Sequence, residues 1–106
     1  MKIGNFDLNK DGVYIIAELS ANHNGSLQTA LDTIKAAKKI GANAIKLQIY
    51  RADTMTLNSK NSDFMIDGGT LWDGKNLYEL YEEAYTPWEW HKELFDYAKS
   101  ININIF

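Results

Sequence analysis

The sequence predicts an α/β fold, namely the N-terminal portion of a (β/α)8 barrel of the TIM type. Strand-like and helix-like segments alternate along the chain, and the two clearest strands, residues 13–19 and 44–49, are separated by one amphipathic helix. Such a strand–helix–strand unit makes a right-handed crossover between parallel strands. A closed barrel takes roughly 250 residues, so we expect the 106 residues of this chain to form about two and a half βα units of an incomplete barrel.

The first βα unit has the clearest pattern. Residues 13–19 are β-branched and aromatic with hardly an interruption, which is typical of a buried strand. The turn-rich segment Ser20–Gly25 follows, Ser26 occupies the expected N-cap of a helix, and Gly41 ends that helix. Apolar residues recur at helical spacing between these two points: Leu27, Ala30, Leu31, Ile34 and Ala37.

The second strand, residues 44–49, leads into a long segment without periodicity, from Tyr50 to about Trp72. Loops of that length in a compact domain are more often functional lids or binding loops than plain connectors. Its apolar residues predict that it folds against another part of the protein: Phe64, Met65, Ile66, Leu71 and Trp72.

Two helices and a third strand complete the predicted order. Asp73 is expected to cap a short helix with one apolar face, made of Leu77, Leu80, Tyr81 and Ala84. Thr86, Pro87 and Glu89 predict the start of the next helix, with Thr86 at the N-cap and Glu89 closing a capping box. Its apolar face consists of Leu94, Phe95 and Ala98. Residues 101–106 alternate like the opening of a third strand.

Composition narrows the class of protein. The net charge is −3 and basic residues are scattered, which disfavours nucleic acid and anionic lipid as partners. There are no cysteines, so disulfides and thiolate chemistry are excluded, as fits a reducing compartment. No apolar run approaches the roughly 20 residues of a membrane span, and the N-terminus lacks the pattern of a signal peptide. We expect a cytoplasmic globular protein.

Polar residues near the ends of the predicted strands are the candidates for a functional site. Glu18 is a carboxylate near the end of a buried strand, where it must be paired or used. Lys46 and Gln48 share one face of the second strand, and in a barrel that face points inward. A lysine there can anchor phosphate or carboxylate. The alternatives are a structural salt bridge for Glu18 and an edge strand with one wet face for Lys46; a Glu18–Lys46 ion pair suits either interpretation.

The loop after the first strand is less specific. Asn22 and His23 lie in turn-forming sequence, and His23 could be a base, a metal ligand or a hydrogen-bonded structural residue, of which the last is favoured. His91, Trp88 and Trp90 are expected to serve packing. No Walker or GxGxxG pattern supports nucleotide binding. The residues alone therefore indicate an α/β enzyme with an anion-binding mouth, without specifying a reaction.

Two segments resemble a known family. Residues 15–26 and 44–50 are similar, in sequence and spacing, to the first two strands of the N-acetylneuraminate (sialic acid) synthase family. Three later segments look like its pseudaminic acid synthase branch: 71–74, 77–81 and 86–90. The resemblance covers nearly the whole chain.

This resemblance implies a TIM barrel followed by a small antifreeze-like domain, in a homodimer. It implies condensation of phosphoenolpyruvate with an amino sugar and release of phosphate; in the pseudaminic branch the sugar is 2,4-diacetamido-2,4,6-trideoxy-altrose. A divalent metal, Mn or Mg, would polarise the sugar aldehyde. The family's metal ligands are not expected among these residues.

Position by position, the resemblance assigns roles to the candidate residues. Glu18 matches a glutamate near the reacting centre, Lys46 a lysine that contacts phosphoenolpyruvate, and Gln48 a glutamine that positions the sugar. Asn22 and His23 match the family's loop, in a role of shaping or of direct contact.

The resemblance also leaves alternatives. Where the neuraminate branch supplies an asparagine to the sugar, this chain has Gly69–Trp72, which favours a less hydroxylated sugar. The alternatives are an N-acetylneuraminate or legionaminate synthase, or a catalytically inert remnant that acts only in self-association through its exposed third strand. We expect the 106 residues by themselves to lack synthase activity.

Overall fold

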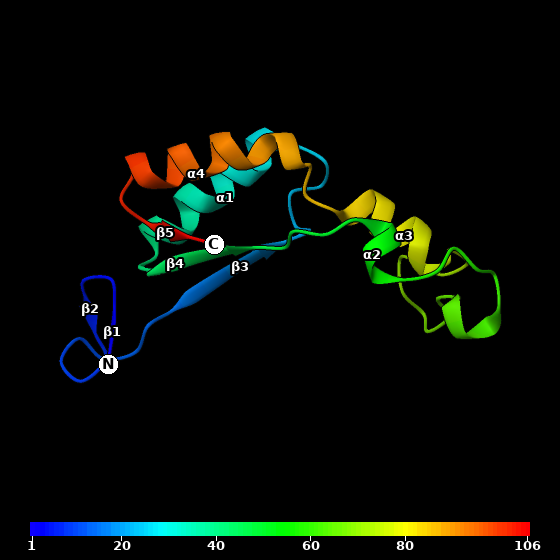
Figure 1. Ribbon diagram of the computed structural model, residues 1–106, viewed down its shortest axis with the longest axis horizontal. Coiled ribbons are helices and arrows are strands. Elements are labelled where there is room, and N and C mark those ends of the chain that lie inside the picture. The colour runs from blue at the N-terminus through cyan, green and yellow to red at the C-terminus, as the bar shows by residue number, and fades with distance from the viewer.

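The computed structural model describes residues 1–106. Its centre is a parallel three-stranded sheet in the order β3 (Ile16–Ser20), β4 (Ala44–Leu47) and β5 (Asn104–Ile105). Helices α1 (Leu27–Lys39) and α4 (His91–Ser100) lie side by side on one face of this sheet, and the other face is uncovered (Figure 1). The predicted α/β class with a parallel sheet is confirmed.

Helix α1 begins and ends where the sequence predicts. The Ser26 hydroxyl accepts a hydrogen bond from the Thr29 amide at 3.2 Å and so caps the first turn. Gly41 follows the helix with a φ of +94°, a left-handed conformation that favours glycine. Lys38 and Lys39 in the last turn complement the negative end of the helix dipole.

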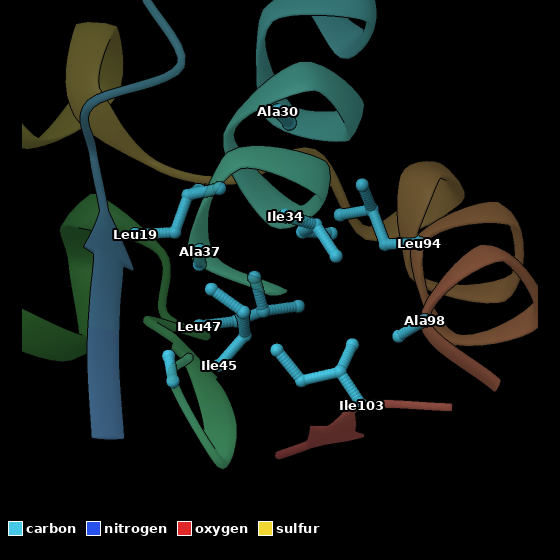
Figure 2. Packing of buried hydrophobic residues seen from close by; sticks show 10 residues of the cluster. Leu19, Ala30, Ile34, Ala37, Ile45, Leu47, Leu94, Ala98 and Ile103 are labelled. Atoms are coloured by element: carbon cyan, nitrogen blue, oxygen red, sulfur yellow. The ribbon is translucent and has the colours of Figure 1, made fainter. Parts of the chain in front are cut away.

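The hydrophobic core fills the layer between the sheet and the two helices. Figure 2 shows its side chains converging from α1, α4 and the strands. Burial of each large aliphatic side chain contributes roughly 1.5–3 kcal/mol, so this layer fixes the helices on the sheet. Its fully or nearly fully buried members include Leu19, Ala30, Ile34, Ile45, Leu47, Leu94, Ala98 and Ile103. None of the helices is long and apolar enough to cross a membrane.

The first strand is shorter and less buried than predicted. It begins at Ile16, and Val13 is 81% exposed. Ile15 and Ile16 are about half exposed, whereas Leu19 is buried against the helices. The expectation of a strand buried on both faces is therefore wrong for this chain, because helices cover only one face of the sheet.

The later apolar pattern also needs correction at three points. β4 ends at Leu47, two residues before the predicted end of the strand, so Ile49 lies beyond it and is 56% exposed. Phe95, expected in the core, lies at the surface of α4. The third strand is present, but its pairing is confined to Asn104–Ile105.

The segment after β4 contains short helices that its sequence did not reveal. Helix α2 spans Ala52–Met55 and the 3-10 turn η1 spans Ser62–Phe64, both too short to produce a periodic pattern. Phe64, Met65 and Ile66 are half-buried, in line with the prediction that this segment folds onto the protein. Leu71 and Trp72 are exceptions, at 97% and 39% exposed.

Helix α3 (Leu77–Ala84) is capped by a different residue from the one predicted. Asn76 Oδ1 accepts from the Glu79 amide at 2.8 Å, and Glu79 Oε2 accepts from the Asn76 amide at 3.1 Å, forming a capping box. The carboxylate of Asp73, the predicted cap, instead accepts hydrogen bonds from the amides of Gly69 and Thr70 and closes the preceding turn.

The predicted capping box at Thr86 does not form. The 3-10 turn η2 (Trp88–Trp90) precedes α4, and Pro87 occupies its N-cap without a side-chain bond. Thr86 is fully buried, with its hydroxyl 3.5 Å from the Ser20 carbonyl oxygen. The Thr86 side chain, which the local pattern assigned to the helix cap, therefore contacts the backbone of Ser20 instead.

The N-terminal residues form a small hairpin that the sequence did not indicate. Strands β1 (Lys2–Ile3) and β2 (Phe6–Asp7) pair antiparallel and lie apart from α1 and α4 (Figure 1). The Phe6 ring packs edge-on against Tyr14 with 5.2 Å between ring centroids, which ties the hairpin to the chain leading into β3.

Candidate active site

The uncovered face of the sheet carries an ion pair between its first two strands. Glu18 of β3 and Lys46 of β4 are register partners, and Lys46 Nζ lies 3.2 Å from Glu18 Oε1. The structure thus brings these two predicted residues together. Their side chains are 51% and 47% exposed, respectively, and such exposed pairs contribute about 0–1 kcal/mol to stability. The pair therefore presents an accessible ammonium beside an accessible carboxylate.

A second polar contact lies one step further toward the carboxyl ends of the strands. The Ser20 hydroxyl donates a hydrogen bond to Oε1 of Gln48 at 2.8 Å. Gln48 was predicted as a site residue and Ser20 was missed. Ser20 lies two residues after Glu18, but the register shifts between them, so period-two alternation alone does not indicate its position.

His23 is a buried residue of the loop that follows β3. It is 1% exposed, its Nδ1 accepts from the Gly25 amide at 3.1 Å, and its ring packs edge-on against Trp90 at 5.2 Å. The proton of the neutral ring therefore resides on Nε2, which is buried without a partner. Burial lowers the pKa of His23, which favours this neutral form.

Asn22 also serves the loop backbone. Its side-chain amide donates to the Leu19 carbonyl at 2.9 Å. No hydrogen bond joins Asn22 or His23 to Glu18, Lys46 or Gln48. The structure thus places the two loop residues in a turn, Glu18 and Lys46 on the open face of the sheet, and Gln48 just beyond the end of β4.

An open cavity of about 570 Å³ lies between α2, α3 and η2. The guanidinium of Arg51 sits 5.8 Å from the ring centroid of Trp88 in its wall, which is a cation–π distance. Trp88 is 52% exposed, so it packs at the boundary of the protein and not in its core. The remaining lining mixes aromatic rings and carboxylates: Tyr78, Tyr85, Asp53, Glu82 and Glu89.

The residues present do not fit a metal centre. No three side chains of the types His, Cys, Asp and Glu lie close enough together to hold an ion. His91, the other histidine, has Nδ1 at 2.9 Å from the Trp88 carbonyl oxygen and a buried Nε2 without a partner, which describes a packing residue.

Comparison with known proteins yields close relatives. The chain is 59% identical, over its whole length, to the pseudaminic acid synthase of Campylobacter jejuni subsp. jejuni serotype O:2, and it covers 30% of that protein. It is 54% identical to the pseudaminic acid synthase of Helicobacter pylori, over 87% of this chain and 27% of the relative. An N,N'-diacetyllegionaminic acid synthase of Legionella pneumophila is 34% identical over 85% of the chain and 25% of its own length. The chain thus spans between 25% and 30% of the length of these curated relatives.

A solved structure supports the fold. The spore coat polysaccharide biosynthesis protein SpsE of Bacillus subtilis superimposes with a TM-score of 0.58 at 31% identity, over 89% of this chain and 23% of that one. The model of the NeuB family matches residues 33–106, from α1 through β4 and the cavity-lining segment to β5. By that match, which includes Lys46 and Gln48, the chain belongs to the NeuB family.

Proposed function

We propose that this chain supplies part of the active site of a pseudaminic acid synthase. The enzyme would condense phosphoenolpyruvate with 2,4-diacetamido-2,4,6-trideoxy-altrose and release phosphate. The observation that carries the proposal is the Glu18–Lys46 pair, which offers a cation for an anionic substrate and a carboxylate for a proton on one accessible face. The identity of 59% to a pseudaminic acid synthase supports the choice of reaction.

The proposal takes β3, β4 and β5 as neighbouring strands of a TIM barrel. Helices cover the outside of such a barrel, and active sites form at the carboxyl ends of its strands. The single-sided cover by α1 and α4 supports this arrangement, since it leaves the face with Glu18 and Lys46 for the interior. The parallel order β3-β4-β5 supports it as well.

In this scheme Lys46 and Glu18 act on phosphoenolpyruvate. The ammonium of Lys46 holds the phosphate or carboxylate group of that substrate as a fixed positive charge. Glu18 accepts a proton from the water that adds to the cationic carbon formed when the enol carbon attacks the sugar aldehyde. The intermediate then collapses with cleavage of the C–O bond, and phosphate leaves.

Gln48 contacts the sugar in this scheme, and Asn22 and His23 hold the loop beside it. A divalent metal, Mn²⁺ or Mg²⁺, belongs to the proposed enzyme through the family resemblance, and it would polarise the sugar aldehyde. The residues of this chain do not form its site, so none of the roles given to Glu18, Lys46 and Gln48 depends on it. We place the enzyme in the cytoplasm as a homodimer, as the resemblance implies.

A chimera tests the function directly. The matching segment of the Campylobacter jejuni synthase is replaced by this chain, and phosphate release is measured with phosphoenolpyruvate and the altrose substrate. Activity is expected, together with its loss in the Glu18→Gln and Lys46→Met variants. Asp32→Asn and Lys35→Met, which remove exposed charges on α1, are the matched controls and should retain activity.

Two outcomes would contradict the proposal. A folded chimera that turns over N-acetylmannosamine or the legionaminate precursor in place of the altrose would assign the chain to another branch. A folded chimera without activity toward any of these sugars would favour the inert remnant, which would then have to show concentration-dependent self-association of the chain.

A further inference from the structure

Ser20 has an unusual backbone conformation at the end of β3. Its φ is +50°, in the left-handed region that residues with a Cβ rarely adopt. The parallel register with β4 also shifts between Glu18 and Ser20, so that Ser20 lies opposite Leu47. Glycine meets such a backbone requirement without strain. A serine at this position is strained where a glycine would not be, and what it has that glycine lacks is a hydroxyl group. The role of this hydroxyl therefore needs an explanation.

The Ser20 hydroxyl is bonded to the side chain of a proposed substrate-binding residue. It donates to Gln48 Oε1 at 2.8 Å, in a half-buried setting. A glutamine amide has one acceptor oxygen and an NH₂ group with two donors. Ser20 occupies one of the two lone pairs of this oxygen, and no protein group accepts from Nε2, so both N–H donors of Gln48 remain free for a ligand.

The backbone on both sides of Ser20 is also fixed by hydrogen bonds. Its carbonyl oxygen lies 3.5 Å from the hydroxyl of Thr86, a side chain with no exposed surface. The backbone N–H of Asn22 closes the next turn by donating to the Leu19 carbonyl oxygen at 2.9 Å. The conformation at Ser20 is therefore supported on both sides, as expected of a strained residue that persists.

We propose that Ser20 is a positioning residue that orients Gln48 so that its NH₂ group donates hydrogen bonds to an oxygen acceptor of the bound amino sugar. Acetamido carbonyl and hydroxyl oxygens are the acceptors that such a sugar offers. The inference rests on the proposed function for its substrate and on the Ser20–Gln48 geometry for its residue.

The first experiment is a double-mutant cycle in the chimera. Ser20→Ala should lower kcat/KM for the sugar roughly three- to tenfold, the range of one hydrogen bond, with the KM for phosphoenolpyruvate unchanged. In a Gln48→Ala background the same change should have no further effect, because its target is absent. Gln48→Glu keeps an acceptor for Ser20 and loses the donors, so it should be as impaired as Gln48→Ala.

Ser20→Gly separates the hydroxyl from the backbone. Glycine adopts the positive φ freely, so this variant should lose the same activity as Ser20→Ala. Full activity in Ser20→Gly would overturn the proposal, since the hydroxyl would then be dispensable. An undiminished effect of Ser20→Ala in the Gln48→Ala background would also overturn it.

The second experiment does not depend on catalysis. The order parameter of the Gln48 side-chain NH₂ group is measured by NMR in the 106-residue chain. It should fall in Ser20→Ala and in Ser20→Gly; an unchanged value would refute the positioning role. If the parent chimera is inactive, the proposed function fails, and this measurement still decides whether Ser20 orients Gln48.

Discussion

The ammonium group of Lys46 lies 3.2 Å from the carboxylate of Glu18, across the paired strands β4 and β3. Both side chains lie on the face opposite the core, because the neighbouring Leu19, Ile45 and Leu47 are buried against the helices. Both side chains are about half exposed, so water screens their attraction. A pair that contributes little to stability leaves both charges available to a ligand, which is the role that we propose for them. This role can be tested by measuring stability and activity separately.

Lys46→Met should therefore separate stability from activity. The free energy of unfolding in urea should change by less than about 1 kcal/mol. In the chimera, kcat/KM for phosphoenolpyruvate should fall at least about 100-fold, the usual cost of removing a group that stabilises developing charge. Lys35→Met is the control for both measurements. A loss of several kcal/mol in stability with activity retained would instead identify the pair as a structural salt bridge.

The placement of Lys46 illustrates what the sequence could predict, whereas Gln48 was expected in the strand and lies just beyond its end. Strand side chains alternate between faces, so the apolar Ile45 and Leu47 determined which way Lys46 would point. The Ser26 cap was equally local. Thr86 shows the limit, because its capping pattern is local while the contact that overrides it is with Ser20, 66 residues away. No local pattern contains that contact.

Asn76→Ala tests the cap that the structure assigns to α3. The substitution removes the acceptor for the Glu79 amide and the donor to Asn58 Oδ1. Because Asn76 is 1% exposed, no water replaces these bonds, and stability should fall by about 1–2 kcal/mol. Urea unfolding measures the change, and Asn76→Asp, which keeps the acceptor, should recover part of it. Asp73→Ala, at the cap expected from sequence, should leave α3 intact by circular dichroism.

The His23 ring makes stability depend on pH. Burial lowers the pKa of His23 in the folded chain below its ordinary value of about 6.5, which applies to the unfolded chain. Above pH 6.5 the ring is neutral in both states, and its contribution to stability is fully present. As the pH falls below that value, the unfolded chain binds a proton that the folded chain excludes, so stability decreases by at most about 1.4 kcal/mol per pH unit.

His23→Asn should remove this component. Asparagine retains an acceptor for the Gly25 amide and cannot titrate, so the slope of unfolding free energy against pH should flatten between about pH 5 and 6.5. His91→Gln, which removes the other histidine, is the matched control and should follow the parent. An identical slope in His23→Asn and in the parent would show that His23 is not the group responsible.

Ser20 was missed in the sequence because its importance depends on backbone geometry. The letters Ser20–Gly25 indicate a turn, but they do not show which residue takes a left-handed φ, and a serine is the less expected choice next to asparagines and a glycine. His23 is buried, and its ring packs on Trp90, a residue far from it in the chain, so no local pattern could show this contact. The contacts that define Ser20 and His23 are made with residues distant in the sequence, which is why the local sequence pattern does not show them.

The left-handed conformation of Ser20 leads to a prediction about stability. At a φ of +50°, a residue with a Cβ is strained by roughly 1–2 kcal/mol relative to glycine. Ser20→Ala keeps this strain and loses the bond to Gln48, whereas Ser20→Gly loses the bond and releases the strain. Ser20→Gly should therefore be more stable than Ser20→Ala by about 1 kcal/mol, after allowance for the greater freedom of glycine in the unfolded chain. Urea unfolding of the two variants measures this difference, and Ala17→Gly within β3, where φ is that of a strand, should instead be destabilising. If Ser20→Ala proves the more stable of the two, the backbone at Ser20 is not left-handed, and the geometry that directs its hydroxyl to Gln48 would have to be abandoned.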